Sequence, residues 1–268
     1  MKHNKFVIAA LIAFCIFEFS VFPQDKKIID LPHSVLADRP YSPAARSGSL
    51  LFIAGQVGID RFGNLVKGGV KVQTKKAIEN LQTVLQADGM TLENVVSTKV
   101  YLADSRFYRE MNEVYAQAFP NMPPTRATLE ADLAIEGSLV EIQATAISSE
   151  LNKRLVTVPD EGPNMRPYSR ALKAGNYLFV AGLISQDLAT GEFVPGDIAT
   201  QTHQTLDNAK LFVQAAGFSM SDVTVSSVFL SDSRDFSAMN EVYQTYFGDI
   251  PPTRATVRTR LMNPKAKL

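Results

Sequence analysis

Two halves of this 268-residue chain repeat the same motifs in the same order. The repeated motifs are Arg-Pro-Tyr-Ser at 39–42 and 166–169, Leu-Phe-Ile/Val-Ala-Gly at 51–55 and 178–182, Met-Asn-Glu-Val-Tyr at 111–115 and 239–243, and Pro-Pro-Thr-Arg-Ala-Thr at 123–128 and 251–256. The first two pairs are offset by 127 residues and the last two by 128, which indicates one inserted residue near 187–191, in a turn. Self-similarity at a fixed period predicts repeated structural units. We therefore expect two domains, residues 39–147 and 166–268, joined by a polar linker at 148–165.

Each copy has the pattern of an α+β domain. Apolar residues Ile78, Leu81 and Leu85 lie on one helix face, and Gly89 follows as a stop signal. Runs rich in β-branched and aromatic side chains favour strands on both sides of this helix. In the first copy the expected strands are 50–53, 95–101, 125–129 and 139–147, and the expected helices lie around 78–85 and 111–115. The order is strands, helix, strand, helix and two strands, with the helices covering a sheet.

The composition excludes several classes of protein. The chain has 27 basic and 27 acidic side chains, whereas nucleic-acid-binding proteins usually carry a basic excess. Its single cysteine excludes an internal disulfide, and three scattered histidines do not make a zinc site. The sequence contains no glycine-rich phosphate loop and no cofactor motif.

The first 24 residues have the pattern of an export signal. Lys2, His3 and Lys5 precede an apolar run at 6–17. A basic segment before a short apolar run is typical of a secretory signal peptide, whereas a membrane-spanning helix needs about 20 apolar residues. We expect cleavage between 20 and 24 and an exported protein, periplasmic or secreted. An uncleaved N-terminal membrane anchor is the alternative, and Cys15 also raises the idea of a lipoprotein.

Arg126 is the main candidate for chemistry. It begins an expected strand directly after Pro123-Pro124, and Arg254 stands in the same setting after Pro251-Pro252. An arginine fixed in this way offers a planar fork that binds a carboxylate through two parallel hydrogen bonds. The alternative is a structural ion pair between Arg126 and an acid such as Glu141.

Glu141 and two tyrosines are further candidates. Glu141 lies in an otherwise apolar strand, and if it points inward beside Arg126 its carboxyl can hold a water or relay a proton. Its alternative is a solvent-facing strand residue, since 141, 143 and 145 alternate with apolar positions. Tyr41 and Tyr168 each follow Arg-Pro, and such a tyrosine either closes a pocket or caps a sheet edge.

The chain resembles the YjgF/YER057c/UK114 family, also called Rid (reactive intermediate deaminase) proteins. The resemblance rests on Pro-Tyr-Ser at 40–42, Ile-Ala-Gly-Gln-Val-Gly at 53–58, and Pro-Pro-Thr-Arg-Ala-Thr followed by Val-Glu-Ile at 140–142. It covers both copies and implies chorismate-mutase-like α+β domains, each a mixed sheet covered on one face by two helices. It further implies trimers with ligand sites in clefts between neighbouring domains. The implied activity is hydrolysis of enamines and imines, such as 2-aminoacrylate, to 2-oxo acids and ammonia, without a metal or organic cofactor.

The resemblance also implies roles for individual residues. The resemblance assigns Arg126 to the substrate carboxylate and Glu141 to the handling of water or protons. The expected substrate-binding residues are Tyr41, Gly55 and Thr128 in the first copy, and Tyr168, Gly182, Arg254 and Thr256 in the second. The chain differs from the best-known imine deaminases at two positions: it has Ala54 where they have serine, and Thr128 where they have cysteine. These departures leave the substrate open.

The sequence therefore predicts an exported tandem Rid-like deaminase acting on small carboxylate-bearing enamines or imines. The alternative is a non-catalytic binder of small carboxylates, which export favours because such imines arise mainly in the cytoplasm. A ribonuclease is disfavoured by the zero net charge. The expected partners are a small carboxylate substrate and further copies of the chain, as a trimer of tandem chains, with no nucleic acid.

The second copy has no counterpart of Glu141 within the sequence. That counterpart would be residue 269, and most of the closing strand expected at 139–147 has no equivalent before Leu268. A sheet without that strand exposes an unpaired edge. We therefore expect the sequence to be a fragment, or else a second copy that binds carboxylates through Arg254 without turning them over.

Overall fold

The structure is a computed structural model that describes residues 26–31 and 40–268. The expected signal segment and Arg39 lie outside the described residues. The first domain contains strands β1 (Lys27–Ile29), β2 (Ala44–Ser47), β3 (Leu50–Val57), β4 (Val95–Leu102), β5 (Thr125–Glu130) and β6 (Val140–Ile147), and helices α1 (Val70–Ala87) and α2 (Tyr108–Ala118). Short 3-10 helices, Leu92–Asn94 and Ser105–Phe107, precede β4 and α2. The predicted order of strands and helices in this copy is confirmed.

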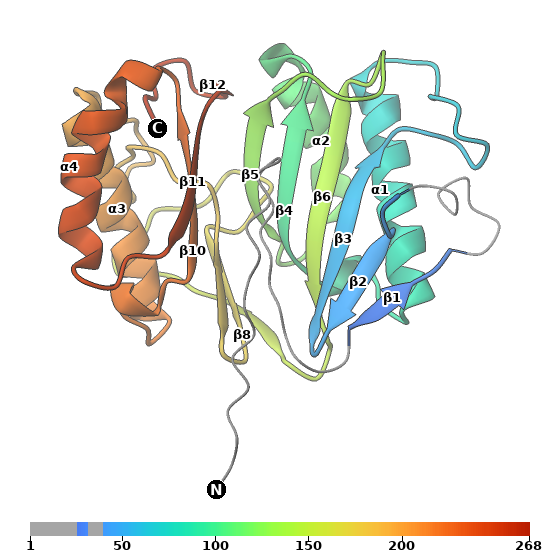
Figure 1. Cartoon of the computed structure of the whole chain (residues 1–268), viewed down its shortest axis with the longest axis horizontal. Helices are drawn as coiled ribbons and strands as arrows, with labels where there is room; N and C mark the ends of the chain where they lie inside the picture. Colours follow the sequence, from blue (N-terminus) through green and yellow to red (C-terminus); the bar gives the residue numbers. More distant parts are fainter. Residues whose placement is uncertain (1–25, 32–39) are drawn as a thin grey trace, which may run out of the picture.

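The first domain is a mixed sheet with both helices on one face (Figure 1). Its strand order is β1-β2-β3-β6-β4-β5-β12, where β12 (Arg260–Leu261) comes from the second copy. Strands β4 and β5 run parallel and the other neighbours run antiparallel. Helix α1 follows Gly69 and presents a buried apolar face that includes Ile78, Leu81 and Leu85. Gly89, with φ of +70°, ends it in the backbone region that favours glycine. The α+β prediction, with two helices covering the sheet, is confirmed.

The second domain repeats the same elements but not the same continuous sheet. Its elements are β8 (Ala171–Ala174), β9 (Tyr177–Val180), α3 (Ile198–Ala215), a 3-10 helix (Met220–Asp222), β10 (Val225–Leu230), a second 3-10 helix (Ser233–Asp235), α4 (Phe236–Phe247) and β11 (Thr253–Arg258). The inserted residue falls in a turn, where Gly191 N donates to Asp187 O (2.9 Å). In the first domain β6 joins β3 to β4, whereas within 40–268 no strand joins the corresponding β9 to β10.

The predicted linker contributes a strand, which the sequence did not indicate. Residues Lys153–Leu155 form β7 and pair antiparallel with β8, as β1 pairs with β2 in the first domain. The edge of β8 would otherwise present unpaired backbone groups, and β7 covers it. The repeated unit therefore begins before the Arg-Pro-Tyr-Ser motif in both copies.

The two domains pack with their strands facing each other and their helices outside (Figure 1). Leu129 of β5 clusters with Leu261, Ala266 and Phe229 of the second domain. The short strand β12 (Arg260–Leu261) pairs with β5 and so extends the sheet of the first domain. Backbone bonds also cross the junction, from Gly182 N to Arg126 O (3.0 Å) and from Ser169 N to Pro124 O (3.2 Å). Among the described helices, none has the length and apolar character needed to span a membrane.

Candidate functional site

Arg126 is buried at the start of β5, at the junction between the two domains. Strand β5 begins directly after Pro123-Pro124 and pairs with β4, so that Arg126 lies beside Thr98. Thr98 shares a hydrogen bond with the Tyr115 hydroxyl of α2, which places this row on the helix-covered face. Only 2% of Arg126 is exposed. The sequence therefore folds so that a cation is held inside the domain.

The Arg126 guanidinium is surrounded by neutral groups. It donates from Nη2 to Asn112 Oδ1 (2.6 Å) and to the Tyr108 hydroxyl (3.4 Å), and Nη1 lies 3.9 Å from Met111 Sδ. Its central carbon lies over three tyrosine rings, of Tyr115 (4.6 Å), Tyr168 (4.9 Å) and Tyr108 (5.6 Å). Among the described residues no carboxylate forms an ion pair with Arg126, and its Nε has no hydrogen-bond partner.

A buried cation without a carboxylate is costly in a folded protein, because desolvation penalises the charge and nothing compensates it fully. Hydrogen bonds to one amide and one hydroxyl, with contacts to aromatic faces, offset part of this cost. The remaining donors of the guanidinium are suited to an anion that arrives with a ligand. The alternative interpretation of Arg126, a structural ion pair with Glu141, does not hold.

Glu141 lies on the opposite face of the same sheet. Strand β4 lies between β5 and β6 and pairs with both. Its Thr98 pairs with Arg126 of β5 and Ala144 of β6. Its Tyr101 pairs with Leu129 of β5 and Glu141 of β6. Ala144 packs in the helix-covered core, whereas Tyr101 and Leu129 belong to the cluster at the domain junction. Of the two alternatives for Glu141, the structure does not place its side chain beside Arg126.

The Glu141 carboxyl packs instead against Gly55. A Cβ atom added to Gly55 would lie 1.7 Å from Glu141 Oε1, so only glycine leaves room for this carboxyl. Burial raises the pKa of Glu141 above its usual value. Gly55 and Glu141 thus form one pair of predicted site residues, separated from Arg126 by the thickness of the sheet.

Tyr168 of the second domain, and not Tyr41 of the first, lies on Arg126. Tyr168 is 8% exposed, and its hydroxyl accepts from Arg166 Nη1 (2.9 Å). Burial raises the pKa of Tyr168, so the phenol stays neutral at physiological pH. The next residue, Ser169, donates from Oγ to Pro123 O (2.6 Å), which fixes the segment to the first domain. Tyr41 is 47% exposed.

The remaining predicted residues divide between the domains. Gly182 contacts the Arg126 backbone, and Thr128 lies two residues after Arg126 on β5. In the second domain Arg254 donates to Asn240 Oδ1 (2.6 Å) and lies over the Tyr243 ring (4.4 Å). Its described ring contacts come from α4 alone, without a tyrosine from the other domain. The hydroxyl of Thr256 on the same strand is buried without a described hydrogen-bond partner.

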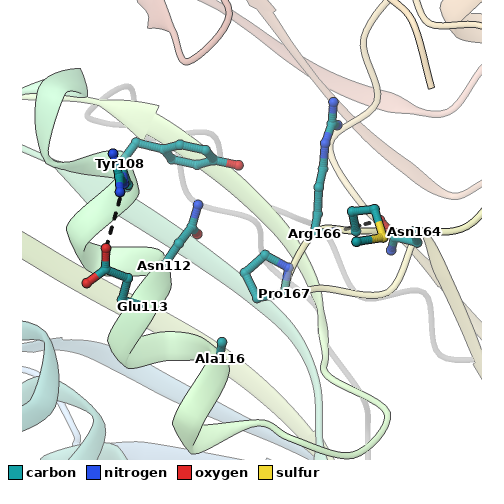
Figure 2. A pocket seen from close by; sticks show the side chains of 9 residues that line it. Tyr108, Asn112, Glu113, Ala116, Asn164, Arg166 and Pro167 are labelled. Carbon is teal, nitrogen blue, oxygen red and sulfur yellow. Dashed lines mark hydrogen bonds and ion pairs between the residues drawn. The ribbon is translucent and has the colours of Figure 1, made fainter.

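An open cleft of about 700 Å³ adjoins the Arg126 site (Figure 2). Its walls come from α2 of the first domain and from the segment before Tyr168 of the second. It is lined by Tyr108, Arg109, Asn112, Glu113, Ala116, Asn164, Met165, Arg166 and Pro167. Tyr108 and Asn112, which both bond Arg126, form part of this lining and connect the buried guanidinium to the cleft.

Sequence reasoning missed three residues of this site: Tyr108, Asn112 and Arg166. Asn112 lies in the repeated Met-Asn-Glu-Val-Tyr motif and Arg166 in the repeated Arg-Pro-Tyr-Ser motif, so repetition itself was the available signal. Tyr108 has only an aromatic counterpart, Phe236, in the second copy. Within the described residues, no cluster of three or more metal-ligating side chains was found.

Comparison with known proteins gives a match on both copies. The model of a family described as Endoribonuclease L-PSP matches residues 32–148 and again residues 161–268. A RutC family protein of Pyrococcus horikoshii is 54% identical over 91 residues, which are 34% of this chain and 72% of the relative. The 2-iminobutanoate/2-iminopropanoate deaminase of Mus musculus is 38% identical over 129 residues, 48% of this chain and 96% of the relative.

A solved structure of RidA from the Antarctic bacterium Psychrobacter sp. is 28% identical, with a TM-score of 0.43. The match covers 46% of this chain and 99% of that one.

Proposed function

Because the chain belongs to the family described as Endoribonuclease L-PSP, which contains the Rid proteins, we propose that it hydrolyses small carboxylate-bearing imines and enamines. The proposed substrates are of the 2-aminoacrylate type, and the products are 2-oxo acids and ammonia. Relatives named 2-iminobutanoate/2-iminopropanoate deaminase support the reaction. One observation carries the assignment to a site: the buried Arg126, without an acid partner among the described residues, beside the cleft between the domains.

In this proposal Arg126 holds the substrate carboxylate. The carboxylate takes guanidinium donors that the protein leaves unused, Nε among them, and the Arg126–Asn112 bond keeps the fork in place. Since only 2% of Arg126 is exposed, the substrate reaches it by displacing the Tyr108 side chain, whose hydroxyl bond at 3.4 Å is long. Tyr168 then covers the substrate from the second domain.

The reaction requires a water molecule positioned beside the imine carbon. Water adds to the electrophilic imine carbon, the C–N bond of the resulting carbinolamine breaks, and the water oxygen becomes the new carbonyl. The nitrogen leaves as ammonia, carrying both hydrogens of the water. Glu113 is the carboxylate among the lining residues. A hydrogen bond from Lys71 lowers its pKa, so Glu113 stays ionised and can accept a proton from water only weakly.

A non-catalytic carboxylate binder is the second candidate, and one observation favours it. Glu141, the acid that the family resemblance assigns to water and proton handling, lies across the sheet from Arg126. Without that acid the cleft can bind a carboxylate while contributing little to hydrolysis. In this case Arg126 would still be required for binding.

Release of ammonia and 2-oxo acid distinguishes the two candidates. The full chain is offered freshly generated 2-aminoacrylate, and hydrolysis is compared with the rate in buffer. The deaminase proposal expects an acceleration that falls by at least about tenfold in Arg126→Ala. The exposed control Arg106→Ala should retain it, since Arg106 pairs with the neighbouring Asp104. Pyruvate binding without any acceleration would favour the binder.

Export and assembly are also proposals. The basic and apolar pattern of residues 1–24 supports export, and N-terminal sequencing of the fractionated protein tests it; an intact Met1 in the cytoplasmic fraction would contradict it. A trimer of tandem chains is supported by aromatic side chains exposed on the first domain, Tyr41 (47%) and Phe52 (37%). Light scattering that shows a strict monomer at micromolar concentration would count against assembly.

A further inference from the structure

The cleft at the domain junction carries an excess of positive charge. Arg109 and Arg166 line it, and Arg126 lies directly behind its Tyr108 and Asn112 wall. The lining contains one acid, Glu113, and this carboxylate is already paired with Lys71 (2.6 Å) and lies 3.7 Å from Arg109.

Two of the three arginines have no carboxylate partner in the part of the chain that the structure describes. Within 26–31 and 40–268, neither Arg126 nor Arg166 forms an ion pair with an acid. The Arg166 guanidinium donates instead to a neutral group, the Tyr168 hydroxyl, at 2.9 Å. The cleft therefore has two cationic groups available for a ligand, one buried and one at the rim.

Tyr168 sets the spacing between these two groups. The Arg126 guanidinium lies 4.9 Å from the centre of the Tyr168 ring, and the Arg166 guanidinium bonds the hydroxyl of that ring. The two cations thus stand along one phenol side chain, one at the face and one at the hydroxyl tip. A ligand that lies along Tyr168 with an anionic group at each end satisfies both. A four- or five-carbon dicarboxylate has this form.

We propose that the cleft prefers 2-imino dicarboxylates with four or five carbons, with Arg126 holding the carboxylate next to the imine and Arg166 the distal carboxylate. This proposal rests on the proposed function and specifies its substrate class. The chemistry is unchanged: water supplies the carbonyl oxygen, the C–N bond breaks, and a 2-oxo dicarboxylate and ammonia leave. Arg166 acts on specificity and does not touch the reacting carbon.

Binding of the 2-oxo acid products tests the preference without any need for turnover. The full chain is titrated calorimetrically with 2-oxoglutarate and with 2-oxopentanoate, which has the same five-carbon chain but no distal carboxylate. Because Arg166 is exposed, solvent partly screens its ion pair with the distal carboxylate of the ligand. We therefore expect 2-oxoglutarate to bind about threefold to tenfold more tightly than 2-oxopentanoate. The preference should weaken as salt is raised.

The variant Arg166→Gln removes the distal cation and keeps a long polar side chain. It should abolish the preference, so that 2-oxoglutarate and 2-oxopentanoate bind with equal affinity. Arg166→Lys should keep part of the preference, since it keeps the charge but loses the fork. The control Arg106→Gln, an exposed arginine outside the cleft, should change neither affinity.

Equal affinities for the two ligands, or a preference that survives in Arg166→Gln, would overturn the inference, as would the absence of binding by both. Failure of the proposed function looks different. A preference that depends on Arg166, in a chain that releases no ammonia, would support this inference while refuting the deaminase. Release of ammonia from 2-aminoacrylate, without a preference for 2-oxoglutarate over 2-oxopentanoate, would support the deaminase proposal and refute this inference.

Discussion

Replacing Arg126 separates a structural role from a binding role. Its guanidinium is buried, bonded to Asn112 and stacked on Tyr115 and Tyr168, and it has no ion pair among the described residues. If these contacts serve the fold, loss of the side chain should mainly lower stability. If they hold the fork ready for a ligand, loss should mainly lower affinity for a carboxylate. We expect the second result for Arg126→Ala and Arg126→Lys.

The expected loss of carboxylate affinity in Arg126→Ala follows from the number of charged hydrogen bonds that are lost. Each bond to a charged group contributes about 1.5–3 kcal/mol, so two parallel bonds contribute about 3 kcal/mol at the lower limit. A change of 3 kcal/mol is roughly a 100-fold change in Kd. Arg126→Ala should therefore weaken pyruvate binding by at least about tenfold if one of these bonds forms, and by at least about 100-fold if both form. Arg126→Lys should recover part of the loss, because it keeps the charge but has no planar fork.

The assay is calorimetric titration of pyruvate into each full-length variant, with thermal unfolding followed in parallel. Arg254→Ala is the matched comparison, because Arg254 has the same asparagine, methionine and tyrosine neighbours. Among the described residues, no tyrosine of the other domain lies over it. We expect Arg254→Ala to change the affinity by less than about threefold. A folded Arg126→Ala protein with unchanged pyruvate affinity would refute the assignment.

Three further predictions concern other parts of the site and fold. Tyr168→Ala should weaken pyruvate binding by about tenfold through loss of the covering ring, whereas Tyr168→Phe keeps the ring and should stay within about threefold of wild type; equal losses would argue against stacking. Burial raises the pKa of Glu141 in the folded state, so the protein loses stability as the pH rises from the pKa of the unfolded state through that of the folded state. Glu141→Gln should therefore raise the unfolding temperature near pH 7 and match wild type near pH 4. A gain that persists unchanged at low pH would show another cause. Gly58→Ala places a Cβ 2.8 Å from the α1 backbone and should cost about 1–3 kcal/mol in urea unfolding, while Gly69→Ala, which meets nothing within 4 Å, should cost far less.

The repeated motifs were sufficient to predict the elements of the fold. Apolar spacing in residues 78–85 gave α1, and Pro123-Pro124 marked the start of β5, because both signals depend on neighbours in the sequence. The sequence also pointed to Arg126 as a cation held in a rigid setting.

The separation of Arg126 from Glu141 could not be predicted, because it depends on register across three strands. Alternation along β6 shows that Glu141 and Ala144 face opposite sides, but not which side Arg126 shares. Pairing of both strands with β4 decides this, and it places Arg126 with Ala144. Tyr168 was predicted as a pocket residue, but its position on Arg126 arises from contact between domains, which no local pattern encodes.

Hydrolysis of carboxylate-bearing imines in the cleft beside Arg126 can be measured directly. The most direct measurement is the initial rate of ammonia release when the purified full chain meets freshly generated 2-aminoacrylate, compared with buffer and with Arg126→Ala. We expect a rate that rises in proportion to protein concentration and that falls by at least about tenfold in Arg126→Ala, because charged hydrogen bonds to the substrate are lost. A wild-type rate equal to the rate in buffer, or equal rates for the wild type and Arg126→Ala, would contradict it.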